Sequence, residues 1–65
     1  MTQMKNLRLK LNKTQAEAAK VTGISIRGYR RIENGENEPR LKTAKALELF
    51  YGKSIEYLLK PFETE

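Results

Sequence analysis

Apolar residues recur along this chain at intervals of three and four positions, which is the spacing of one face of an α-helix. Met4, Leu7 and Leu11 form the first such stripe and predict a helix over about residues 4–11. The alternation of apolar and polar positions that is typical of β-strands is absent from the sequence, as are internal repeats. The pattern therefore predicts an all-α fold, a compact bundle of about five short helices.

The segment after this stripe opens with a helix-start signal. Thr14 is a suitable N-cap, and Glu17 follows at the position that completes a capping box. The predicted helix runs over about residues 15–21. Ala18 and Ala19 favour the helix and are also thin enough to let another helix approach closely.

A third helix follows after a tight turn. Gly23 allows the positive φ of a reversal, and Ser25 is a suitable N-cap for a helix over about residues 26–34. Two helices joined by such a short glycine-containing turn form a helix-turn-helix, here over about residues 15–34.

Turn-forming residues divide the rest of the chain. Asn34 and Gly35 favour a turn with left-handed conformations, and Pro39 suits the first turn of a following helix. A short acidic tail over residues 61–65 begins with a proline that cannot continue a helix. The helices predicted here span about residues 40–51 and, after an N-cap at Ser54, residues 55–59.

Helical projection divides residues 26–33 into two faces. Tyr29 and Ile32 form the apolar stripe that we expect to be buried. The other side carries one apolar residue and three cations: Ile26, Arg27, Arg30 and Arg31. Such cations repel one another unless an anion lies opposite, so this side is either an ordinary solvated face or a surface for an anionic ligand.

The composition limits the available chemistry. The 65 residues suffice for one domain and include neither Cys nor His. Disulfides and cysteine-ligated metals are thereby excluded, and the commonest base at neutral pH is missing. The carboxylates are scattered rather than paired, so no nucleophile and base are visible together. We expect no metal, no cofactor, no small-molecule ligand and no enzymatic activity.

The net charge points to a class of partner. Thirteen Lys and Arg residues against eight Asp and Glu give a formal charge of +5. This excess favours an anionic partner such as nucleic acid, although a merely soluble basic surface has the same composition. No apolar run approaches the ~20 residues that span a bilayer, and the N-terminal residues resemble no signal peptide. We expect a cytoplasmic protein with no membrane association.

These features together resemble a known family. The sequence "TQAEAAKVTGISIRGYRRIENG", followed by a proline and a leucine, resembles the lambda-repressor/Cro-like helix-turn-helix of the XRE family of bacterial and phage regulators. The resemblance extends from about Leu7 to Leu59. It implies a lambda-repressor-like DNA-binding domain that occupies residues 1–65, and a location at the bacterial nucleoid.

The resemblance implies a role for individual positions. The positions matching base-contacting residues are Ile26, Arg27 and Arg31, where Ile26 could pack on a thymine methyl group. The positions matching phosphate contacts are Gln15, Ser25, Arg30, Asn34 and Lys42. The resemblance also implies that Gln15 braces the recognition helix. Gln15 is otherwise a plain helix-start residue, and Lys42 is otherwise an ordinary surface lysine. Arg8 and Glu33 match a largely buried ion pair, which we assign to structure rather than to DNA binding.

Some positions depart from the family. An apolar residue is usual where Lys13 stands, leucine is usual at Ala18, and alanine is often found at Glu48. Ile26 replaces a frequent glutamine. The departures at Lys13, Ala18 and Glu48 affect the packing and not the positions that would face DNA, whereas Ile26 is one of those positions.

Proteins of this kind generally bind palindromic DNA as two-fold dimers. The late part of the chain holds surplus apolar residues that either form the dimer contact or cover the core of one domain. They are Leu49, Phe50, Tyr57, Leu59 and Phe62.

Two functional hypotheses follow. The first is a sequence-specific regulator of transcription, a repressor that binds double-stranded DNA as a homodimer through the major groove. The alternative is an antitoxin of a toxin–antitoxin pair, or a small module that binds another regulator. Co-purification with a toxin-like protein distinguishes the second from the first.

Overall fold

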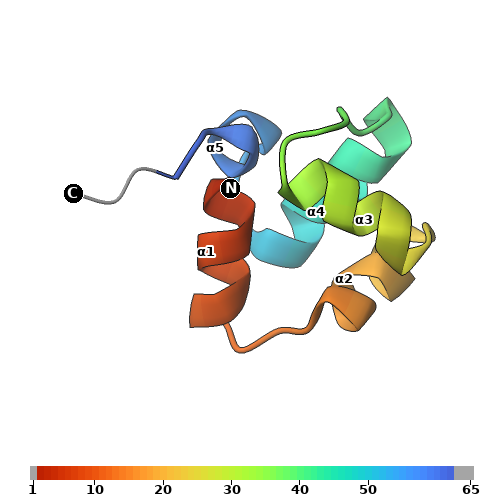
Figure 1. The fold of residues 1–65 in the computed structure, drawn as a ribbon, viewed down its shortest axis with the longest axis horizontal. Helices are drawn as coiled ribbons and strands as arrows, with labels where there is room; N and C mark the ends of the chain where they lie inside the picture. Colours follow the sequence, from red (N-terminus) through yellow and green to blue (C-terminus); the bar gives the residue numbers. More distant parts are fainter. Residues whose placement is uncertain (1, 63–65) are drawn as a thin grey trace.

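The computed structural model describes residues 2–62, which form five α-helices and no β-strand (Figure 1). The helices are α1 (Gln3–Lys10), α2 (Gln15–Thr22), α3 (Ile26–Glu33), α4 (Leu41–Tyr51) and α5 (Ile55–Leu59). α2 packs against α3 and α4, while α5 packs against α1 and α4. In Figure 1, α1 and α5 accordingly lie on one side and α2 and α3 on the other. The predicted all-α bundle is confirmed.

At the predicted starts of α2 and α3, side chains cap the free backbone amides. Thr14 Oγ1 accepts a hydrogen bond from the Glu17 amide at 3.0 Å, and the Glu17 carboxylate accepts one from the Thr14 amide at 2.8 Å. Gly23 ends α2 at φ 75°. Ser25 Oγ then accepts a hydrogen bond from the Gly28 amide at 3.0 Å and opens α3. The helix-turn-helix thus depends on two local caps and one left-handed glycine.

The end of α1 differs from the prediction. The helix stops at Lys10, and Leu11 is its C-cap, 44% exposed, rather than the last member of a buried stripe. Asn12, with a left-handed φ of 58°, ends the helix just after Leu11, so no further turn of α1 continues the stripe. Leu9 is also exposed, which leaves the inward face of α1 to Met4, Leu7 and Arg8.

The loop before α4 differs as well. Asn34 has a right-handed φ of −83°, and only Gly35, at φ 80°, adopts the predicted left-handed conformation. Pro39 lies outside α4 because the N-cap is Arg40 and the helix begins at Leu41. Its fixed φ therefore shapes the loop rather than the first helical turn.

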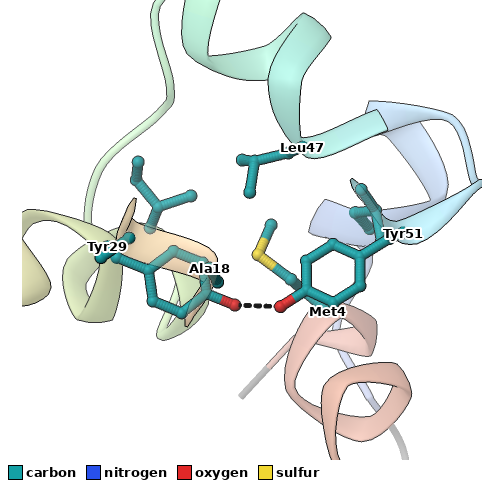
Figure 2. Close-up of a cluster of buried hydrophobic side chains, with 8 residues drawn as sticks. Met4, Ala18, Tyr29, Leu47 and Tyr51 are labelled. Carbon is teal, nitrogen blue, oxygen red and sulfur yellow. Dashed lines mark hydrogen bonds between the residues drawn. The ribbon is translucent and has the colours of Figure 1, made fainter. Parts of the chain in front are cut away.

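One apolar cluster forms the core between the helices (Figure 2). Met4, Tyr29, Leu47 and Leu58 are fully buried within it. Figure 2 shows the hydroxyl groups of Tyr29 and Tyr51 facing each other, where they form a buried hydrogen bond. The bond joins α3 to the end of α4. Burial raises the pKa of both hydroxyls, so both tyrosines are neutral at ordinary pH.

Two departures from the family pattern have structural roles. The Glu48 carboxylate accepts a hydrogen bond from the backbone amide of Ile55 at 2.7 Å, which satisfies one of the amides left unpaired at the start of α5. Lys13 places its Nζ 5.6 Å from the centroid of the Phe50 ring, a cation–π contact. Both side chains therefore fix connections between helices.

The beginning of the chain lies beside its C-terminal part. The Gln3 amide donates to the carbonyl of Lys60 at 2.8 Å, and Thr2 forms an isolated β-bridge with Pro61. The Thr2 hydroxyl also donates to the carbonyl of Glu33 at 2.7 Å, which satisfies a backbone group at the end of α3. No helix within residues 2–62 combines the length and hydrophobicity required to cross a membrane.

Candidate nucleic-acid interface

The two predicted faces of α3 differ in burial as expected. Tyr29, Ile32 and Glu33 are buried against the rest of the domain. The opposite side is exposed along the whole helix: Ile26, Arg27, Arg30 and Arg31. Within residues 2–62, the hydrogen bonds and the ion pair involve neither the Arg27 nor the Arg31 side chain. These two guanidinium groups are therefore available to an external acceptor.

Arg30 differs from its two neighbours because it contacts α2. Its Nε donates a hydrogen bond to the Oε1 atom of Gln15 at 3.0 Å. Gln15 is half-buried at the first position of α2 and donates from Nε2 to Glu33 Oε1 at 3.2 Å. One amide side chain therefore connects the exposed side of α3 with its buried side.

Arg8 and Glu33 lie together inside the domain. Arg8 Nε donates to Glu33 Oε2 at 2.9 Å, and Arg8 Nη2 donates to Oε1 at 3.2 Å. The guanidinium therefore binds the carboxylate in a bidentate manner. Arg8 Nη1 donates to the carbonyl of Lys13 at 3.0 Å. Glu33 is 0% exposed, yet no buried side-chain nitrogen or oxygen in residues 2–62 lacks a partner. The pair satisfies the condition under which a buried charge is tolerated.

The environment of Glu33 keeps it charged. Burial by itself would raise the pKa of the Glu33 carboxyl, but Arg8, Tyr29 and Gln15 together outweigh it and hold the pKa below the usual value. Glu33 in turn raises the pKa of Arg8 against the opposing effect of burial. The carboxylate and the guanidinium thus each favour the charged form of the other.

The remaining expected phosphate contacts surround this exposed arc. Ser25 and Lys42 are exposed at the starts of α3 and α4, and the Asn34 side chain donates to Glu36 Oε2 at 3.4 Å. Lys42 lines an open groove between the turn after α2 and the start of α4. Arg40 lines the same groove and adds a cation that is not among the expected phosphate contacts.

The apolar residues late in the chain do not share one environment. Phe50 and Leu59 are half-buried and pack against the core, so both are at least partly committed to the domain itself. Phe62 is half-buried as well. Leu49 is 87% exposed, and Lys53 Nζ lies 5.5 Å from the centroid of the exposed Tyr57 ring. Of the five candidates, Leu49 and Tyr57 have the greatest exposure.

Two contacts of the site were missed by sequence reasoning. The first is the hydrogen bond from Thr2 to the end of α3. The second is the identity of the partners of Gln15, Glu33 and Arg30, since the resemblance implied only that Gln15 braces this helix. Each joins residues that are at least 15 positions apart. No local periodicity reveals such pairs, although a glutamine opening α2 beside an exposed arginine on α3 was a partial signal.

The fold and this surface together define a class of protein. A three-residue turn joins α2 to α3, and α3 presents, on a basic chain, two arginines whose side chains have no partner among residues 2–62. A helix of this kind fits the major groove of DNA, where arginine can donate two hydrogen bonds to guanine. The arrangement is that of a helix-turn-helix DNA-binding domain.

The sequence comparison gives the family. Residues 4–58 match the helix-turn-helix family of the Cro and lambda-repressor type. The chain belongs to this XRE family of helix-turn-helix proteins, and it is accordingly a DNA-binding regulator. No curated protein and no solved structure matches the chain significantly.

Proposed function

We propose that this protein regulates transcription by placing α3 in the major groove of a specific double-stranded DNA site. The observation that carries the proposal is the exposed arc of α3, where Arg27 and Arg31 have no partner within residues 2–62 while the opposite face is buried. In this arrangement Arg27 and Arg31 donate to base edges, and Ile26 packs on a thymine methyl group.

Contacts to the DNA backbone would flank these bases. Lys42, with Arg40 in the same groove, would neutralise phosphates on one side of α3. Arg30 would do so on the other, with Gln15 beside it as an uncharged phosphate contact. Ser25 and Asn34 lie at the two ends of the helix and can add neutral hydrogen bonds. The result is a reading helix framed by sequence-independent contacts.

The mechanism we propose is repression by occupancy. The family match places residues 4–58 in a DNA-binding fold. Binding to the operator would itself block polymerase, without catalysis, in the cytoplasm at the nucleoid of a bacterial host. One recognition helix reads only a few base pairs, so a homodimer on a palindromic operator supplies the needed specificity.

Selection from random DNA duplexes, followed by sequencing, tests this function. We expect enriched sites with two inverted half-sites about 10 base pairs apart from centre to centre. Binding to the enriched site should weaken steeply with salt because phosphate neutralisation releases counterions. A selection that enriches no sequence, or binding that does not change with salt, would contradict the proposal.

A separate prediction concerns the dimer. We expect sedimentation at micromolar concentration with the selected operator to show two chains per duplex. Leu49→Lys should shift the complex towards one chain per duplex because it places a charge on the most exposed apolar side chain. Leu41→Lys is the matched control, since Leu41 is also an exposed leucine on α4. A monomer both with and without DNA would exclude the dimer.

A further inference from the structure

Four side chains form a continuous polar connection from the interior to the exposed side of α3. Arg8 holds the Glu33 carboxylate at two points. Gln15 donates to Glu33 Oε1 at 3.2 Å, and Arg30 donates to Gln15 Oε1 at 3.0 Å. We call this set, Arg8, Glu33, Gln15 and Arg30, the polar relay. It runs from the buried Arg8–Glu33 pair to the exposed charge of Arg30.

The relay fixes which way the Gln15 amide points. A carboxylate only accepts hydrogen bonds, so the amide must turn its NH₂ group towards Glu33. A guanidinium only donates, so the carbonyl oxygen must turn towards Arg30. Both neighbours therefore require the same orientation. In it the NH₂ group of Gln15 donates to the Glu33 carboxylate, and its carbonyl oxygen accepts from Arg30.

This contact leaves most of Arg30 free. The guanidinium has five N–H donors, and the bond to Gln15 uses only the one on Nε. Both terminal amino groups remain, in the forked geometry that suits a phosphate. Arg27 and Arg31 lack a comparable tether within residues 2–62, so of the three arginines only Arg30 is held before DNA arrives.

We infer that Glu33 and Gln15 are positioning residues that hold Arg30 ready to bind the DNA backbone. The inference rests on the proposed function. It extends the role of the buried ion pair, because Glu33 then serves DNA binding as well as folding. Fixing a flexible side chain before binding removes an ordering cost of about two- to twelvefold in affinity.

A double-mutant cycle on DNA affinity tests this inference. Gln15→Met removes both hydrogen bonds at nearly constant size, and Arg30→Met removes the tethered charge. We expect Gln15→Met to weaken operator binding about two- to twelvefold when Arg30 is present, and less than about twofold when Arg30 is replaced. Arg30→Met should also reduce the slope of log affinity against log salt by about one.

Arg31 provides the matched control. It is an exposed arginine on the same helix with no bond to Gln15, so Gln15→Met and Arg31→Met should have additive effects on affinity. If Gln15→Met has the same effect with and without Arg30, Gln15 contacts DNA independently and the inference is wrong. Melting temperatures of all variants, measured in parallel, identify any loss of affinity that comes from unfolding.

A measurement without DNA separates this inference from the proposed function. In nuclear magnetic resonance spectra we expect the Arg30 Nε proton to exchange with water more slowly than those of Arg27 and Arg31, and Gln15→Met to remove the difference. Equal exchange of all three in the parent protein would overturn the relay. A protected Arg30 proton in a protein that selects no DNA site would instead overturn the proposed function, and with it the relay's role in binding.

Discussion

Replacing Glu33 with alanine is expected to lower the free energy of unfolding by about 3–5 kcal/mol, the usual cost of removing one partner from a buried ion pair. The variant leaves the Arg8 guanidinium, which is only 8% exposed, without its carboxylate. It also removes the acceptor for Gln15. A domain of this length has a total stability of roughly 3–10 kcal/mol. Glu33→Ala therefore removes from about a third to all of the stability, and we expect it to melt well below the parent domain when unfolding is followed by circular dichroism.

Glu38→Ala is the matched control for this variant. Glu38 is an exposed glutamate in the loop before α4, and its loss should change stability by less than about 0.5 kcal/mol. A Glu33→Ala protein that melts at the parent temperature would show that the ion pair is not needed for folding.

The Glu33 carboxylate also determines the direction in which the stability of the domain changes with pH. The pKa of Glu33 is lowered from 4.5, the value we take for the unfolded chain. Its contribution to stability is therefore complete above that pH and is lost as the pH falls through the lower folded value. Acid should destabilise the parent domain in this range, and a Glu33 variant that still folds should lack this part of the loss.

The second large effect concerns DNA. Arg27→Ala and Arg31→Ala should each weaken binding to the selected operator by about 1–3 kcal/mol and relax the base preference at one position. The reason is that a bidentate arginine–guanine contact discriminates among base pairs, whereas a phosphate contact does not. Binding titrations against a panel of operators with single base changes measure both effects.

Lys10→Ala serves as the control for charge alone. It removes one exposed cation from α1 rather than from α3, so it should slightly weaken binding to every operator in the panel. If both arginine variants retained the parent affinity and base preference, α3 would not be the reading helix.

The local features of this fold were predictable because short-range chemistry determines them. The capping box of Thr14 and Glu17 and the cap at Ser25 need only a side chain and an amide three residues away. The burial of Tyr29 and Ile32 follows from helical periodicity. For the same reason the exposed arc of α3 could be recognised in the sequence before the arrangement of the helices was known.

The remainder depends on contacts between distant residues. Leu11 continued the apolar period, but it lies at the very end of α1, just before the left-handed turn at Asn12, and it is exposed. Arg30 shares the exposed arc with Arg27 and Arg31, and only the position of α2 distinguishes it from them. The Arg8–Glu33 pair could be expected from the family resemblance alone, because periodicity places Glu33 merely at the border of the buried face.

The paired hydroxyls of Tyr29 and Tyr51 give this domain an optical signal of its own. The chain has three tyrosines and no tryptophan, so its near-ultraviolet spectrum comes mainly from these rings. Two of them are buried and hydrogen-bonded to each other, while Tyr57 lies at the surface and is an internal reference. The absorbance and fluorescence of tyrosine should therefore report directly on the contact between the recognition helix and α4. Unfolding can be followed in the unlabelled protein, without an introduced fluorophore that would disturb so small a core.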